Sequence, residues 1–180
     1  MPGVRKRRSR QVNKSTETVS PRASWFAWTL ATWFGSGRSP WAPGTAGTAA
    51  TLPLVYLFAR YGPVWGSWNP ACLLAAILLF YPAVVVATAV ETELGHHDPG
   101  LVVVDETIGT LLTFAFLPAT ALHSPYSYVA VFFLFRLLDV WKPGFIGQSQ
   151  ALPRGWGIVI DDVLAGLVGG VLLGILWHFI

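Results

Sequence analysis

Charged residues are scarce in this 180-residue chain. Asp, Glu, Lys and Arg together make up 12% of the sequence, whereas hydrophobic residues make up 53%. An average soluble domain carries about 25% charged residues. This shortage excludes an ordinary soluble enzyme, an intrinsically disordered chain and most nucleic-acid-binding proteins, so we expect no nucleic-acid partner.

Cysteine is nearly absent as well. The single cysteine, Cys72, lies inside an apolar run, so neither a disulfide nor a multi-cysteine metal site can form within one chain. We also expect no secretory signal peptide, because no apolar core follows the basic segment 5–10 until Trp25 and no small-residue cleavage site closes it.

The positive charge is concentrated in residues 1–22. This segment has a net charge of +6, whereas residues 23–180 have a net charge of −3. Cytoplasmic segments next to membrane helices are enriched in Lys and Arg. We therefore expect 1–22 to be a basic, disordered cytoplasmic tail and 23–180 to be one membrane-embedded domain.

Long uncharged stretches predict an all-α, polytopic membrane helix bundle. A membrane-spanning helix needs about 20 mostly apolar residues, and uncharged stretches cover 39–59, 61–90, 107–135 and 163–180. The third stretch contains Pro118 and Pro125, which favour a turn between two helices. Counting it as a hairpin gives about five spans, at 43–60, 71–90, 106–122, 126–141 and 158–180. If the third stretch crosses the membrane only once, the count is four.

The five-span count gathers the charges on one side of the membrane. Twelve of the thirteen charged residues beyond position 22 then fall in or beside loops 35–42, 91–105 and 142–157, on the side of the basic tail. Only Arg60 lies on the opposite side. We expect the shared side to be the cytoplasmic face and to carry the active-site loops. Small residues also recur at four-residue spacing in 165–174, which predicts close packing of the last helix.

Acidic residues fall in three places within or beside the predicted spans, namely Asp105 with Glu106, Asp139, and Asp161 with Asp162. Charge at membrane depth is costly, so such residues are functional candidates. An excess of carboxylates favours a bound cation, and an all-oxygen ligand set suits Mg²⁺. Helix capping is the alternative, but it does not explain two adjacent pairs together with a mid-helix acid.

Segment 35–48 is rich in Gly, Pro and hydroxyl residues and ends where a helix is predicted to begin. Such a loop can present backbone N–H groups to an anion, although a plain turn explains the composition equally well. It is not a P-loop, because the Lys after the second glycine is missing. With the carboxylates and the basic residues Arg136 and Lys142, it suggests phosphoryl chemistry on a lipid head group.

Four blocks of the chain carry these features in order, namely Gly35–Thr48, His97–Gly109, Phe135–Pro143 and Gly157–Gly166. Over about residues 25–180, they resemble the bacterial phosphatidylglycerophosphatase A family. The resemblance implies a multi-pass, Mg²⁺-dependent phosphatase of the bacterial inner membrane. Its substrate would be phosphatidylglycerophosphate, which loses its terminal phosphate to give phosphatidylglycerol in phospholipid biosynthesis, and its surroundings would be membrane lipids.

The resemblance also assigns roles to individual residues. It implies metal-binding and catalytic carboxylates at Asp105, Glu106, Asp139, Asp161 and Asp162. It implies a proton donor or acceptor pair at His97 and Asp98. The phosphate-binding set would be Arg136, Lys142, Arg38, Gly44 and Thr45. Residues 144–156 depart from the family pattern, which puts substrate contacts from this loop in doubt.

Two mechanisms and two rival classes fit parts of this pattern. Attack by a metal-activated water and attack by an aspartate are both compatible with the residues, and the absence of an Asp-x-Asp-x-Thr/Val signature favours water. A CDP-alcohol phosphotransferase is disfavoured because the chain has no Asp-Gly pair. A non-enzymatic membrane scaffold or channel would use the acids only as helix caps.

Overall fold

The computed structural model describes residues 22–63, 65 and 68–179, so all but the last residue of the predicted basic tail lies outside the described residues. Within these residues the chain is helical and forms no β-strand beyond one isolated bridge between Trp65 and Trp68. The elements are α1 (Trp25–Ala31), the 3₁₀ helix η1 (Ser36–Arg38), α2 (Pro43–Tyr61), α3 (Pro70–Leu94), α4 (Val104–Ala115), α5 (Ala119–Leu122), α6 (Pro125–Trp141), α7 (Phe145–Ser149) and α8 (Gly155–Trp177).

Local sequence explains several helix ends. Proline occupies the first position of α2, α3 and α6, where its missing N–H costs no helical hydrogen bond. The Asn69 side chain caps α3 by accepting a hydrogen bond from the Cys72 N–H. At the other end of α3, Gly95 adopts a left-handed conformation that glycine tolerates without steric cost.

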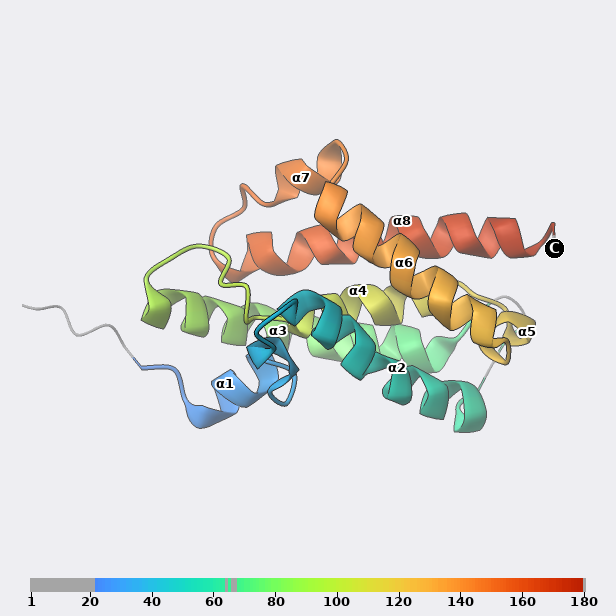
Figure 1. The fold of residues 1–180 in the computed structure, drawn as a ribbon, viewed down its shortest axis with the longest axis horizontal. Coiled ribbons are helices and arrows are strands. Elements are labelled where there is room, and N and C mark those ends of the chain that lie inside the picture. The colour runs from blue at the N-terminus through green and yellow to red at the C-terminus, as the bar shows by residue number, and fades with distance from the viewer. Residues whose placement is uncertain (1–21, 64, 66–67, 180) are drawn as a thin grey trace, which may run out of the picture.

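The five longer helices lie along the long axis of the molecule and run in alternate directions (Figure 1). They are α2, α3, α4, α6 and α8, and α4 packs against each of the other four. All twelve residues of α4 are buried. The bundle is therefore built around α4, with the longer helices enclosing it.

Small residues bring α4 and α8 into close contact. A Cβ atom added at Gly166 of α8 would lie 2.4 Å from the carbonyl oxygen of Gly109 in α4. One turn later, the Thr113 hydroxyl donates a hydrogen bond of 3.2 Å to the Gly166 carbonyl. The close packing predicted from the small residues of 165–174 is confirmed.

The predicted turn after the third span is also confirmed. Helix α4 ends at Ala115, the four-residue α5 follows Pro118, and α6 begins at Pro125. The segment 106–122, predicted as one span, is not one continuous helix, because the chain leaves the helical path at Phe116. At about 1.5 Å per residue, α4 is about 18 Å long, well short of a hydrocarbon core of about 30 Å.

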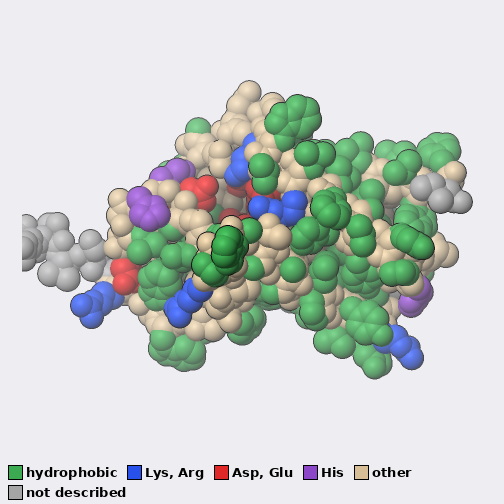
Figure 2. Space-filling model, in the orientation of Figure 1, with side chains coloured by type: hydrophobic (Ala, Val, Ile, Leu, Met, Phe, Trp, Pro, Cys, Tyr) green, Lys and Arg blue, Asp and Glu red, His purple; other side chains and the backbone are tan. Residues whose placement is uncertain are grey.

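Among the residues that the structure describes, two helices are long and apolar enough to cross a membrane by themselves, α3 and α8. Helix α2 has 19 residues and α6 has 17, close to the length that a span requires. Large hydrophobic side chains are exposed on the outer surfaces of these helices, including Leu78, Phe133 and Ile175. Figure 2 shows how widely such side chains cover one face of the molecule.

Candidate active site

Five carboxylates from three helices converge on one cavity of about 250 Å³. Asp105 and Glu106 begin α4, Asp139 lies in the last turn of α6, and Asp161 and Asp162 lie in the second turn of α8. All five side chains are buried. Figure 2 shows acidic and basic side chains gathered in a hollow on this face. The clustering predicted from the sequence therefore exists in the folded chain.

The packing of α4 explains how the carboxylates come together. The contact between Gly109 and Gly166 places α8 directly against the first turns of α4. Asp162 is one helical turn before Gly166, and Asp105 is one turn before Gly109. Residues that are four apart lie on the same helix face, so both carboxylates are directed toward one end of this contact.

Three of the carboxylates form a group that fits a divalent cation. One oxygen from each of Asp105, Glu106 and Asp162 can be chosen so that all three lie within 4.8 Å of one another. Glu106 Oε2 and Asp162 Oδ2 are buried without a hydrogen-bond partner. Unpaired buried carboxylate oxygens are costly, and a divalent cation would satisfy them. Carboxylate oxygens are also the ligands that Mg²⁺ prefers.

Two basic residues line the same cavity. Arg136 Nη1 lies 2.5 Å from Asp139 Oδ2 and 3.6 Å from Glu106 Oε1. Lys142 Nζ lies 2.5 Å from Asp161 Oδ2 and 3.8 Å from Asp139 Oδ1. Asp139 is thus shared between the two basic groups. Six carboxylates, with Asp98 at the rim, against two cations leave the cavity negatively charged, which again suits a bound cation.

Helix capping does not explain the acidic residues of α8. This helix begins at Gly155, and Asp161 and Asp162 come six and seven residues later. The stabilising effect of an acid on a helix N-terminus is confined to the first turn. Asp105 and Glu106 do lie in the first turn of α4, where the Asp105 carboxylate accepts a hydrogen bond of 3.1 Å from the Glu106 N–H, so capping accounts for this pair alone.

Glycine at position 44 forms part of the cavity wall. A Cβ atom added there would lie 2.2 Å from Glu106 Oε1 and 2.8 Å from Arg136 Nη1. Gly44 and Thr45 both belong to the predicted phosphate-binding set. Gly44 lines the cavity with Ala42 and Pro43, whereas Thr45 does not. Position 44, in the first turn of α2, therefore has no room for a side chain beside Glu106 and Arg136.

Two other glycines of the predicted anion-binding loop serve packing. A Cβ atom added at Gly37 would lie 2.1 Å from the Leu101 carbonyl oxygen. One added at Gly47 would lie 2.7 Å from the Val103 side chain. These contacts press segment 35–48 against the chain that leads into α4. Gly100 and Val102 of that chain line the cavity, and sequence reasoning missed them because they carry no polar side chain.

The remaining predicted site residues are separated by the structure. Asp98 lines the rim of the cavity, whereas His97 and Arg38 do not and are exposed. His97 Nδ1 instead pairs with Glu91 Oε1 at 2.6 Å. This hydrogen bond raises the pKa of His97 above its ordinary value of 6.5. Glu91 was missed as a partner because it lies on the preceding helix.

The profile of a known protein family covers this whole arrangement. The phosphatidylglycerophosphatase A profile matches residues 29–177. This chain belongs to the phosphatidylglycerophosphatase A family. The resemblance drawn from the four sequence blocks is thereby confirmed, and neither rival class receives support.

Individual members of the family extend the match over most of the chain. Phosphatidylglycerophosphatase A of Escherichia coli is 35% identical over 151 residues, which cover 83% of this chain and 82% of that protein. The Haemophilus influenzae phosphatidylglycerophosphatase A is 33% identical, over 80% and 84% of the two chains. A Bacteroides thetaiotaomicron protein with the provisional name phosphatidylinositol-3-phosphatase is 34% identical, over 86% and 95%. No solved structure matches the chain significantly.

Proposed function

We propose that this chain is a phosphatidylglycerophosphatase, which hydrolyses the terminal phosphate monoester of phosphatidylglycerophosphate to phosphatidylglycerol and inorganic phosphate. The family and its members support this activity. The observation that carries it is the juxtaposition, in one cavity, of three clustered carboxylates and the basic pair Arg136 and Lys142. Clustered acids can hold a metal ion, and fixed basic groups can hold phosphate oxygens.

Each residue of the cavity has a distinct role in this proposal. Asp105, Glu106 and Asp162 would hold Mg²⁺, which when bound stabilises negative charge on the phosphoryl group and activates water. Arg136 and Lys142 bind the phosphate oxygens that the metal does not contact.

Two further carboxylates position these basic groups. Asp139 lies between Arg136 and Lys142 and orients both, while Asp161 holds Lys142 by its short ion pair. This arrangement keeps both cations directed at the cavity before substrate binds, which avoids an ordering cost during binding.

The reaction that fits this arrangement is direct attack of water on phosphorus. The new bond joins the water oxygen to phosphorus, and the bond from phosphorus to the glycerol oxygen breaks. The glycerol oxygen takes up a proton as it leaves. We assign both proton transfers to Asp98, at the rim of the cavity, which accepts the proton that the attacking water loses and gives it to the departing glycerol oxygen.

The exposed aromatic residues support a membrane-spanning arrangement. Trp25, Trp41 and Trp141 are exposed near the end of the bundle that carries the cavity. Exposed Tyr61, Trp65, Tyr126 and Phe179 lie toward the opposite end, where α2 and α8 finish (Figure 1). Tryptophan and tyrosine are enriched at both membrane interfaces. The two groups therefore resemble the two aromatic belts of a membrane protein.

We propose that five segments traverse the bilayer, namely α2, α3, α4 with α5, α6 and α8. Helix α4 does so as a short inner helix that is shielded from lipid by the other four. The cavity and loops 35–42, 91–105 and 142–157 would then face the cytoplasm at the bacterial inner membrane, together with the basic tail. The excess of positive charge in residues 1–22 supports this orientation.

Phosphate release by the purified full-length chain in detergent micelles tests the activity. The chain should hydrolyse phosphatidylglycerophosphate with added Mg²⁺. It should lose this activity when a chelator is added and regain it when Mg²⁺ is added again. Phosphatidylinositol-3-phosphate serves as the second substrate, because one relative carries that name. Absence of hydrolysis of phosphatidylglycerophosphate under all conditions would contradict the proposal.

Cysteine labelling in intact cells tests the orientation. In a Cys72→Ala background, Gln148→Cys in α7 should be protected from an impermeant reagent, whereas Thr120→Cys in α5 should be labelled. Both native residues are exposed. Labelling of Gln148→Cys from outside would contradict the five-segment arrangement.

A further inference from the structure

A second, larger cavity lies between α2 and α6, beside the α5 turn. It encloses about 850 Å³ and shares no lining residue with the catalytic cavity. Its walls are mostly apolar, with Leu52, Pro53 and Leu57 on α2 and Leu122 and Pro125 on the opposite side. The chemistry assigned to the catalytic cavity does not use this groove.

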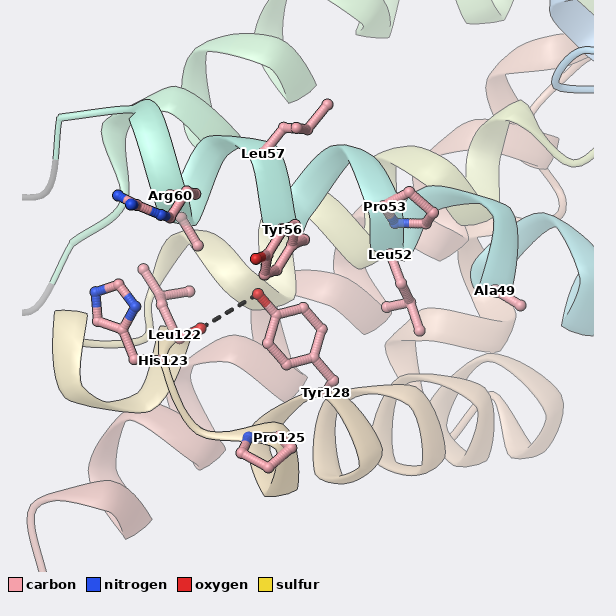
Figure 3. Close-up of a pocket in the computed structure, with 11 residues that line it drawn as sticks. Ala49, Leu52, Pro53, Tyr56, Leu57, Arg60, Leu122, His123, Pro125 and Tyr128 are labelled. Atoms are coloured by element: carbon pink, nitrogen blue, oxygen red, sulfur yellow. Dashed lines mark hydrogen bonds between the residues drawn. The ribbon is translucent and has the colours of Figure 1, made fainter.

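The groove has one polar end and one apolar end. Figure 3 places Arg60 and His123 together at one end and Ala49 at the other, with the rings of Tyr56 and Tyr128 between them. The Tyr128 hydroxyl donates a hydrogen bond of 3.2 Å to the Leu122 carbonyl, which fixes its ring along the wall. This polarity matches that of an amphiphile with a charged head and an apolar tail.

The charge at the polar end has no counter-ion in the part of the chain that the structure describes. Arg60 lies over the Tyr61 ring at 5.5 Å and takes no part in the ion pairs of the structure. Every acidic residue after position 22 belongs to the opposite half of the bundle or its loops. An arginine is always charged at physiological pH, so this end favours an anion.

The polar end is remote from the catalytic cavity. Arg60 follows Gly44 by sixteen residues on the same helix, which corresponds to about 24 Å along α2. A lipid whose phosphate lies at Arg60 therefore cannot place it among the catalytic carboxylates. The distance from Arg60 back to Ala49 is about 16 Å by the same rise, close to half of a hydrocarbon core about 30 Å thick.

We propose that this groove binds one anionic phospholipid from the leaflet opposite the catalytic cavity. Its phosphate contacts Arg60 and His123, and one acyl chain lies along Leu52, Tyr56 and Tyr128. This inference rests on the membrane arrangement given under Proposed function, and it does not depend on phosphatase activity. A free anion would leave most of the apolar wall exposed, whereas an acyl chain covers it.

Native mass spectrometry of the detergent-solubilised full-length chain tests the site. The chain is supplied with phosphatidylserine or with phosphatidylcholine, neither of which is the proposed substrate or product. Wild type should retain one phosphatidylserine at least about tenfold more strongly than phosphatidylcholine. Arg60→Gln combined with His123→Gln should abolish this preference, and Ala49→Trp should reduce retention of both lipids by filling the groove. Glycerol phosphate, which has the phosphate but no acyl chains, should not be retained.

Two matched variants assign the bound lipid to this groove. Leu78→Trp also introduces a tryptophan, on the exposed surface of α3 away from the groove, and should leave retention unchanged. Arg136→Gln removes a cation from the catalytic cavity and should also leave it unchanged. Unaltered phosphatidylserine preference in the Arg60 and His123 double variant, or its loss in Arg136→Gln, would overturn the proposal. A test of lipid retention remains valid whether or not the chain hydrolyses phosphatidylglycerophosphate.

Discussion

The Lys142 ammonium lies 2.5 Å from Asp161 Oδ2, although the two residues belong to different helices. Lys142 ends α6 in a left-handed conformation, with φ of 47°, and its side chain reaches α8. A lysine that anchors a helix end would extend toward water or lipid head groups. Lys142 instead contacts two buried carboxylates at the cavity, which favours a role in holding phosphate.

Lys142→Gln and Lys142→Arg should both lose at least about tenfold in kcat/KM, or about 1.4 kcal/mol of transition-state stabilisation. Glutamine removes the charge, and the longer planar guanidinium of arginine does not fit a contact made for a compact ammonium. Steady-state phosphate release and membrane fractionation measure activity and insertion. Arg154→Gln is the matched control, because Arg154 is exposed and does not line the cavity. Full activity in Lys142→Arg would instead identify an anchor.

Asp162→Asn should abolish the thermal stabilisation that Mg²⁺ gives to the wild-type chain. Asp162 Oδ2 is buried without a partner, so removing its charge should leave the metal-free melting temperature unchanged or higher. A ligand stabilises a fold only when it binds the folded state, so melting in detergent with and without Mg²⁺ reports binding independently of turnover. Asp98→Asn, at the exposed rim, should keep the Mg²⁺ response. An unchanged Mg²⁺ response in Asp162→Asn would exclude this carboxylate as a ligand.

Sequence reasoning located the carboxylates and the hairpin because both depend on local signals. Pro118 and Pro125 disfavour a continuous helix wherever they lie, and charged groups in an apolar chain must find one another or water. The predicted span continues to residue 122, although Pro118, two residues after the C-cap Phe116, is a common signal for the end of a helix. The outward position of His97 reflects its pairing with Glu91, which lies only six residues earlier, near the end of α3.

The glycines of segment 35–48 illustrate a limit of prediction from sequence. Composition indicated an anion-binding loop, but Gly37 and Gly47 are needed because Leu101 and Val103 lie against them. Contacts between segments that are more than fifty residues apart leave no local trace in a single sequence. Gly44 is the one glycine of this segment that lines the cavity.

Gly44→Ala should reduce kcat/KM at least tenfold while Gly100→Ala leaves it nearly unchanged. The added methyl group at position 44 would lie 2.2 Å from Glu106 Oε1, so Glu106 or Arg136 must move. Gly100 also lines the cavity, but an added Cβ there meets nothing within 4 Å. Kinetics of the two purified variants check this contrast. Equal activities would show that the cavity wall at Gly44 can relax without affecting the carboxylates.

Gly166→Ala should destabilise the bundle by about 1–3 kcal/mol, the usual cost of overpacking. Its Cβ would lie 2.4 Å from the backbone oxygen of Gly109, which cannot rotate away as a side chain could. Gly169→Ala is the matched control on the same helix, because its Cβ would make ordinary contacts of 3.4 Å or more. Thermal unfolding in detergent compares the two variants. Similar melting temperatures would contradict the close approach of α4 and α8.

The His97–Glu91 pair should give a pH-dependent contribution to stability without contributing to catalysis. The hydrogen bond to Glu91 raises the pKa of His97, and the neighbouring Asp98 charge acts in the same direction. Because the folded-state pKa is raised, the stabilisation is fully present below the unfolded value near 6.5 and is lost as the pH rises through the folded value. Glu91→Gln should therefore lower the pKa of His97, which NMR titration of its imidazole measures. His97→Gln should retain kcat/KM within about twofold of wild type, since the ring does not line the cavity. A large loss of turnover in His97→Gln would contradict this prediction and show that His97 takes part in catalysis.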